Sequence, residues 1–543
     1  MKIYSIKKLS AALLSAALAA SAGAAENTYY IWAGATAHYG EPNPLNSENW
    51  STSNTEYVAP PEGTEMNSPD ANWVFDYGAY LPTSGRQDNI YYRIETSTLR
   101  LNSISIINHD ATTTGYWDTN GYHETGGNTG IKIVSNKSDS NWNIGTFKYT
   151  GAAGSDDRGV NFGAANRDSS QAIITVGEMN IGYGENKTRF SIGPDAAGTA
   201  YATVESGNVK VGDPVGLSDS SGPKSLTITG DFNIHGNTTV NMNVYDNDAS
   251  AVHSEASPDV VVGGVVRMTQ NESGTSPTWN LLYRASTVGW ATGIPKVPAT
   301  NTYIKIGGLN GTGTVTNNSR TLEASTVKLI FANETDCEFT GVFTENRSDT
   351  IKTVMSVKMA GKNGAKQIIR ADAKFTGTVE VESGTLIMNS TTALGKLTMT
   401  GGAFGGIDGG IIVSSAEWRG GDFIFYSADA MNGGWIDVIK IDGTFAKAGE
   451  GKIGIDFAGF DPSVFIEDGT VLELITAQAL EGFSPDTDAD EYFSAKNLAN
   501  GFADFEWVGN TLTVSFSAVP EPAALAAIIG AAVLVIAAAR RRK

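Results

Sequence analysis

The stretch that decides the fold is Phe375–Gly395, with the sequence FTGTVEVESGTLIMNSTTALG. Apolar residues alternate with polar ones on both sides of Gly384, for example at Val379 and Val381 before it. Period-two alternation bounded by Gly, Ser or Asn is typical of short, half-buried strands. Because Gly tolerates the positive φ or the close approach that a bend needs, the stretch predicts two strands joined at Gly384.

Part of this stretch recurs, since Val204–Val211 (VESGNVKV) matches Val381–Met388 (VESGTLIM). Weaker similarity is present at Phe339–Phe343 and Gly421–Phe425. The longer copy resembles the autotransporter-associated β-strand repeat, although one full copy and one half copy are fewer than a tandem array. A strand–turn–strand unit cannot bury its apolar side alone, so stacked units are expected. The repeat predicts an all-β protein built as a β-solenoid, similar to a right-handed parallel β-helix, with a β-sandwich as the alternative.

Further alternation predicts strands through the rest of the interior. The pairs and triplets are Leu99/Leu101, Ile104/Ile106, Ile131/Ile133, Ile174/Val176, Leu226/Ile228, Phe232/Ile234 and Val240/Met242/Val244.

Both ends of this interior read as caps, because open solenoid ends invite aggregation. At the C-terminal end we expect strands at Thr470–Ile475 and Thr511–Phe516, with a helical turn at Gln478–Gly482 between them. At the N-terminal end the order Trp32-Ala-Gly, Asn49-Trp-Ser and Asp88-Asn-Ile-Tyr resembles the start of autotransporter-like surface proteins. We expect its aromatic residues to cover the end of the fold.

The segment Val519–Lys543 has three parts: Pro520, Glu521 and Pro522; an uncharged run Ala523–Ala539; and the cations Arg540, Arg541, Arg542 and Lys543. As a helix the run would span roughly 25 Å, the low end of what crosses a bilayer, and the cations would stay cytoplasmic. The layout resembles the PEP-CTERM sorting signal of Gram-negative envelope proteins. The resemblance implies an exosortase-type membrane protease that recognises the Pro-Glu-Pro motif and removes the helix. A simple membrane anchor is the alternative.

The first residues predict a secretory signal peptide, in which Lys2, Lys7 and Lys8 precede the apolar run Leu9–Ala20. Small residues follow, so cleavage is expected after Ala24 or Ala25.

Composition narrows the class of protein. The 543 residues carry a formal charge of −20, which argues against nucleic acid as a partner. The 62 glycines and the absence of long amphipathic patterns favour many tight turns and an all-β fold. The single cysteine, Cys337, excludes an intramolecular disulfide and is expected to be buried and inert, with an intermolecular bridge as the alternative.

No catalytic motif stands out in the sequence. The histidines His38, His109, His123, His235 and His253 lie far apart and in no metal-ligand spacing. Three acidic segments are candidates for a site. Asp486–Glu491 begins like a calcium loop but lacks the Gly and the final Glu of such a loop. The other two are Asp246-Asn-Asp248, which reads as a turn, and Asp156-Asp157-Arg158, an acidic pair beside a cation. We predict no catalytic residue, no metal site and no cofactor, with calcium as the weak alternative.

We therefore expect a signal peptide (1–25), an N-terminal β region or cap (26–165), a β-solenoid (166–444), a C-terminal β cap (445–518) and a sorting signal (519–543) with a transmembrane helix (523–539) and a basic tail (540–543). The predicted function is that of a non-enzymatic exported protein of the cell surface or extracellular matrix, contributing to adhesion or an exopolysaccharide layer. Its expected partners are the exosortase-type protease, the membrane, and exopolysaccharide or cell-surface glycans. The alternative is a β-helical polysaccharide lyase or glycoside hydrolase, or a glycan-binding protein, in which a tryptophan would stack on sugar rings. The candidates are Trp32, Trp50, Trp73, Trp279, Trp290 and Trp418.

Overall fold

The structure is a computed structural model that describes residues 27–31, 45, 47–53, 56–76, 89–94, 98–109, 130–135, 139–151, 159–164, 171–181, 188–192, 208–212, 226–236, 238–245, 254–256, 258–270, 274–281, 301–317, 326–346, 354–425, 438–484, 487–519 and 540. The chain divides into two compact units. Unit 1 comprises residues 1–367 and 375–377, and unit 2 comprises residues 368–374 and 378–543. The predicted segment boundaries at residues 165 and 444 stay predictions.

In the part of unit 1 that the structure describes, nearly all regular structure is strand, together with the 3₁₀ turn η2 (Ser47–Asn49). The strands are β1 (Thr28–Ile31), β2 (Trp50–Ser51), β3 (Asn72–Asp76), β4 (Asn89–Ile94), β5 (Thr98–His109), β6 (Gly130–Ser135), β7 (Asp139–Gly151), β8 (Gly159–Ala164), β9 (Gln171–Ile181), β10 (Thr188–Ile192), β11 (Asn208–Gly212), β12 (Leu226–Ile228), β13 (Phe232–His235), β14 (Thr238–Tyr245), β15 (Val260–Val262), β16 (Val266–Thr269), β17 (Thr278–Asn280), β18 (Asn301–Ile306), β19 (Leu309–Gly311), β20 (Thr314–Asn317), β21 (Thr326–Phe331), β22 (Cys337–Phe339), β23 (Val342–Glu345) and β24 (Val354–Ala360).

Unit 2 is also mainly strand, and it holds the short helix α2 (Ser463–Asp468) and the 3₁₀ turn η4 (Ala489–Glu491). β25 (Lys366–Asp372) has residues in both units. The others are β26 (Val379–Ser383), β27 (Thr385–Asn389), β28 (Leu397–Gly406), β29 (Ile411–Val413), β30 (Ala416–Ile424), β31 (Ile439–Lys447), β32 (Ile453–Asp456), β33 (Leu472–Glu481), β34 (Phe493–Lys496), β35 (Gly501–Val508) and β36 (Thr511–Ala518).

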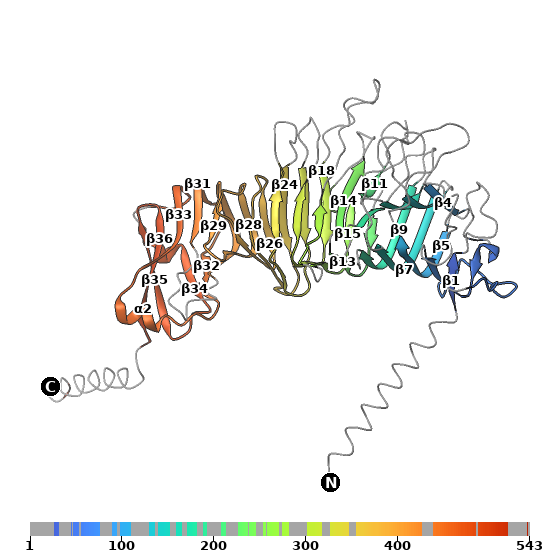
Figure 1. The fold of residues 1–543 in the computed structure, drawn as a ribbon. Coiled ribbons are helices and arrows are strands. Elements are labelled where there is room, and N and C mark those ends of the chain that lie inside the picture. The colour runs from blue at the N-terminus through green and yellow to red at the C-terminus, as the bar shows by residue number, and fades with distance from the viewer. Residues whose placement is uncertain are drawn as a thin grey trace, which may run out of the picture. The chain divides into compact units, whose positions relative to one another are not determined.

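The strands of unit 1 stack in parallel columns (Figure 1). β12, β15, β18, β21 and β24 pair successively in one column, β13, β16, β19 and β22 in a second, and β14, β17, β20 and β23 in a third. In the first column Ile228, Val262, Ile306, Phe331 and Met359 stand in register. All five side chains are buried, so successive strands contribute equivalent residues to one continuous core.

The columns continue toward the start of the chain. β3, β5, β7 and β9 pair in parallel, and the long strand β9 pairs with both β12 and β13. Before them, β1 pairs parallel with β3 and antiparallel with β2. Trp50 and Trp73 lie there with ring centroids 5.1 Å apart, and both are fully buried. Of the aromatic residues expected to cover this end, Trp50 packs in the core, whereas Trp32 lies outside the described residues.

Where the first two columns meet, glycines from successive strands stack on one another. A Cβ on Gly177 would lie 2.3 Å from the carbonyl oxygen of Gly145, and one on Gly230 would lie 2.1 Å from that of Gly177. Real Cβ atoms essentially never approach so closely. The glycines therefore allow adjacent backbones to make contact at this corner, which explains part of the high glycine content.

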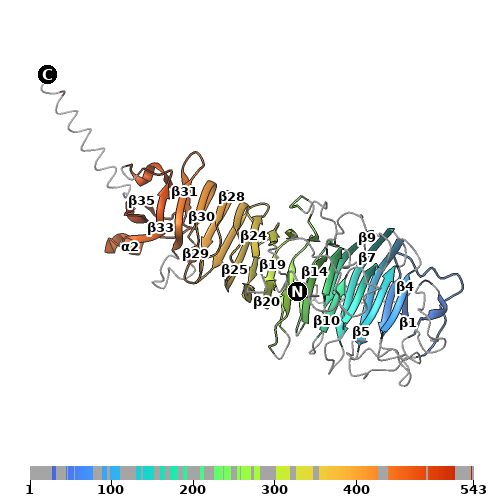
Figure 2. The same ribbon diagram turned by 90° about the horizontal axis from the view of Figure 1, so that it is seen from above.

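Unit 2 has the same kind of parallel pairing but ends differently (Figure 2). β26, β28, β30 and β32 follow one another with parallel partners, and β31 pairs parallel with β33. β33 then pairs antiparallel with β36, and β36 pairs antiparallel with β35. Aromatic rings such as Phe457, Phe493, Phe505 and Phe516 contact one another beneath these strands. The antiparallel strands and the rings close this end of the parallel stack.

Most local predictions agree with the structure. The fold is all-β, the predicted alternating segments lie in strands, and Gly384 joins β26 to β27 with a φ of 76°. The predicted helical turn at Gln478–Gly482 is wrong. Gln478–Glu481 belongs to β33, because Ala479, Leu480 and Glu481 pair with the extended strand β31.

Candidate functional site

Strand β36 ends at Ala518, two residues before Pro520 in the sequence. Its last pairs are Phe502 with Ser517 and Gly501 with Ala518. Helix α2 packs against the same strand, and next to Gly501 lie Pro462 and Ile466, whose side-chain carbons would be 2.8 and 3.6 Å from a Cβ there. Sheet pairing therefore fixes the chain up to Ala518, and the Pro-Glu-Pro motif follows after a single further residue.

Apolar side chains surround this point. Phe502 is 56% exposed and Val519 is 51% exposed, while Phe465 and Ile466 of α2 are half-buried. We call the two exposed side chains Phe502 and Val519 the tail-exit surface; α2 packs on the opposite face of β35, where a Cβ on Gly501 would meet Ile466. The sequence analysis did not predict β35, although its acidic residues Asp504 and Glu506 share the exposed face with Phe502 and the buried Phe505 lies on the other face.

The predicted sorting and processing residues themselves lie mostly outside the described part of the chain. This holds for Ala24 and Ala25, for Pro520, Glu521 and Pro522, and for Arg541, Arg542 and Lys543. Arg540 is described and is exposed. Across the described ranges, no helix combines the length and the apolar character that crossing a bilayer requires.

The tryptophans that are described serve the core. Trp50, Trp73 and Trp279 are fully buried and Trp418 is 3% exposed. The indole nitrogen of Trp73 donates to the carbonyl oxygen of Met66 (2.9 Å), and that of Trp418 donates to Gly421 (2.9 Å). These four rings present no open face to a sugar. Trp32 and Trp290 lie outside the described residues.

The acidic segment near residue 488 is used for local structure. Asp488 caps η4 by accepting from the amide of Asp490 (3.1 Å), and Asp490 accepts from the amide of Phe505 (3.1 Å). Burial raises the pKa of Asp490; the Phe505 amide opposes this, while the carboxyls of Asp504 and Asp488 raise it further. Asp488 and Asp490 therefore act as acceptors for backbone amides in this segment. Asp486 lies outside the described residues, as do the other two acidic groups considered, Asp156–Arg158 and Asp246–Asp248.

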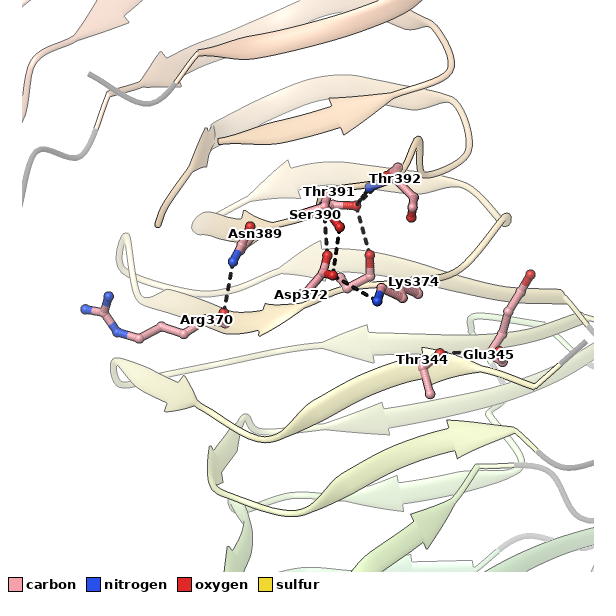
Figure 3. A network of polar contacts seen from close by, with 10 residues as sticks. Thr344, Glu345, Arg370, Asp372, Lys374, Asn389, Ser390, Thr391 and Thr392 are labelled. Atoms are coloured by element: carbon pink, nitrogen blue, oxygen red, sulfur yellow. Dashed lines mark hydrogen bonds and ion pairs between the residues drawn. The ribbon is translucent and has the colours of Figure 1, made fainter. Parts of the chain in front are cut away.

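A second polar cluster lies between the end of β25 and the turn after β27 (Figure 3). Asp372 accepts from both the amide and the hydroxyl of Thr391 (2.8 Å each), and its other partner is Lys374 (3.0 Å). The buried hydroxyl of Ser390 donates to the carbonyl oxygen of Ala373 (2.8 Å). Burial alone would raise the pKa of Asp372, but the Thr391 and Lys374 contacts outweigh it, so the pKa lies below its ordinary value. The cluster holds a turn in place and its carboxylate is fully engaged.

Other carboxylates are paired with cations. Glu255 contacts Lys328 of β21 (2.5 Å) and Lys358 of β24 (2.6 Å). Burial opposes the shift, but hydrogen bonds and charge from the two ammonium groups lower the pKa of Glu255. Glu417 likewise pairs with Lys396. Pairing of this kind lowers the basicity that acid–base catalysis requires.

Two residues with reactive side chains, Cys337 and His235, lie at least partly inside the fold. Cys337 is buried, and burial raises the pKa of its thiol. His235 is half-buried, and burial lowers the pKa of its imidazole. Within the ranges that the structure describes, no group of three or more His, Cys, Asp or Glu residues could hold a metal ion. No protein-family model, no curated protein and no solved structure matches this chain.

Proposed function

We propose that the chain is a non-enzymatic, exported protein of the cell surface or extracellular matrix, sorted through its C-terminal tail. The proposed fold is a β-solenoid with β caps. Its support is the register of Ile228, Val262, Ile306 and Phe331, because equivalent buried residues on successive parallel strands are what stacked rungs require. Shielded ends suit such a stack, since they leave fewer free strand edges for aggregation.

The observation that carries the proposal is the direct continuation of β36 into the tail. The last paired residue is Ala518, and the sequence then runs Val519, Pro520, Glu521, Pro522 and the apolar run 523–539. Because only one residue separates the Pro-Glu-Pro motif from the folded cap, the cap would lie close to the membrane that the apolar run 523–539 enters. This arrangement suits a membrane protease of the exosortase type, which would cut beside a folded domain.

The proposed role at the surface is adhesion or participation in an exopolysaccharide layer. The acidic balance of −20 favours solubility and disfavours nucleic acid as a partner. A polysaccharide lyase or hydrolase would need carboxylates or cations that converge on one groove. In the described ranges, the carboxylates discussed above accept from backbone amides or pair with lysines, and the four tryptophans are buried. The surface role is therefore the better supported of the two.

The test measures how the chain is distributed among the inner membrane, the outer surface and the medium in cells that encode an exosortase-type protease. We expect the wild-type chain to reach the outer surface or the medium. The variant Pro520→Ala/Glu521→Ala should instead accumulate in the inner membrane. The matched control is Pro61→Ala/Glu62→Ala, which changes an exposed Pro-Glu pair in the N-terminal part of the chain. Equal distribution of all three chains would contradict the sorting role of the tail.

A further inference from the structure

We propose that the tail-exit surface rests on the lipid surface of the membrane that holds the tail, with Phe502 and Val519 inserted at the boundary between headgroups and acyl chains. The inference rests on the proposed function, because it requires the run 523–539 to lie in a bilayer. It adds that the folded cap itself is a membrane-contacting surface.

The first argument is the reach of the chain. Sheet pairing holds Ala518 opposite Gly501, and the apolar run starts at Ala523. Five residues span at most about 18 Å when fully extended. The headgroup layer on one side of a bilayer occupies roughly 6 Å of that distance. The end of β36 therefore stays within about 12 Å of the headgroups, which is roughly the diameter of one helix.

The second argument is the chemistry of the side chains at this point. Phe502 and Val519 are more than half exposed (56% and 51%). Aromatic and aliphatic side chains of interfacial segments bury about 5–10 Å into the headgroup–acyl boundary. An exposed phenylalanine beside the tail gains by the same burial.

The third argument is charge, which decides the kind of lipid. The exposed charged side chains that share the face of β35 with Phe502 are acidic: Asp504 and Glu506. Carboxylates gain nothing from anionic lipid. The contact is therefore apolar, made to a neutral, zwitterionic lipid surface, and the carboxylates keep it shallow.

The strand β35 supplies an internal control. Val508 lies on the same strand, six positions from Phe502 and thus on the same face, and it is 59% exposed. At about 3.4 Å per residue it lies roughly 20 Å away. Its partner is Thr511, at the hairpin end farthest from Ala518. The proposal places Phe502 in the membrane boundary and Val508 in water.

The experiment uses the full chain in phosphatidylcholine vesicles, with Cys337→Ala as background. A fluorophore is attached at Phe502→Cys, at Val519→Cys as a second reporter, or at Val508→Cys as the control. Circular dichroism checks that each labelled chain is folded. Spin-labelled lipid should quench the first two positions at least about threefold more strongly than the control, because quenching requires contact with the boundary region.

Equal, weak quenching at all three positions in chains that remain bound to vesicles would overturn the proposal while leaving the membrane tail intact. Chains that fail to bind vesicles at all would overturn both the proposal and the anchoring function of the tail.

Discussion

The glycine corner of unit 1 makes a sharp prediction for Gly230→Ala. The added Cβ would lie 2.1 Å from the carbonyl oxygen of Gly177, whereas ordinary contact begins at 3.4 Å, so the backbones must separate by about 1.3 Å. Two backbone hydrogen bonds join β9 to the segment around Gly230: Thr229 donates to Val176 (2.8 Å) and Met179 donates to Asp231 (3.0 Å). Both bonds must lengthen or break.

The size of the effect follows from three contributions. Overpacking of a close-packed site costs about 1–3 kcal/mol, and each weakened backbone hydrogen bond costs about 1 kcal/mol. Alanine also reduces the entropy of the unfolded chain, which offsets about 0.4–1 kcal/mol. We expect unit 1 to lose about 2–4.5 kcal/mol of unfolding free energy on balance.

The assay is urea unfolding followed by circular dichroism. The matched control is Thr269→Ala, which introduces the same residue at an exposed position of β16 and should change stability by less than about 0.5 kcal/mol. A Gly230→Ala protein as stable as this control would refute the close packing of the corner.

Three further predictions concern other parts of the chain. Trp73→Ala removes a fully buried ring and should cost about 3–5 kcal/mol, seen as faster proteolysis near the N-terminal end of unit 1; unchanged proteolysis would contradict a packed end. The pKa of Glu255 lies below its ordinary value of 4.5, so its stabilising contribution is complete above pH 4.5 and is lost as pH falls through the folded pKa; acid unfolding of Glu255→Gln should be less steep, and an identical acid transition would argue against the ion pairs. The pKa of Asp490 is raised, so this carboxyl stabilises at low pH and the contribution is lost as pH rises through the folded pKa; Asp504→Asn should lower that pKa in an NMR titration and raise stability at pH 7, and an unshifted titration would remove Asp504 as a cause.

The strands could be predicted from the sequence because their signal is local. In β26 the alternation needs only one buried face, and the structure shows that face at Val379 and Val381. β27 differs, because Leu386, Ile387 and Met388 are all buried and both of its faces are covered. The single error among these elements, at Gln478–Gly482, has a non-local cause. The pattern Gln-Ala-Leu-Glu suits a helix turn, but pairing with β31 holds it extended.

The pairing between strands could not be predicted in the same way. Alternation says which side of β18 is buried but not that Ile306 stands between Val262 and Phe331. The close glycine stack is equally hidden, because Gly145, Gly177 and Gly230 are separated by variable lengths of chain. Helix α2 begins at Ser463, directly after Pro462, and ends at Asp468, before Gly469, which has a φ of 65°. Those boundary residues were readable, but a helix of six residues gives little periodicity.

The sorting part of the candidate site stays a prediction, made because charge and hydropathy change abruptly along the tail. The apolar surface around Phe502 could not be predicted, since it depends on which face of β35 remains exposed after packing. For the tryptophans, the residue type alone suggested stacking on sugar rings. The four that the structure describes are buried and belong to the core.

Export and sorting are tested together by the intact mass of the chain recovered from the cell envelope and from the medium. We expect a mature chain that lacks residues 1–24 or 1–25 and also lacks the apolar run and basic tail that follow the Pro-Glu-Pro motif. A full-length chain that retains both ends would contradict export and sorting together.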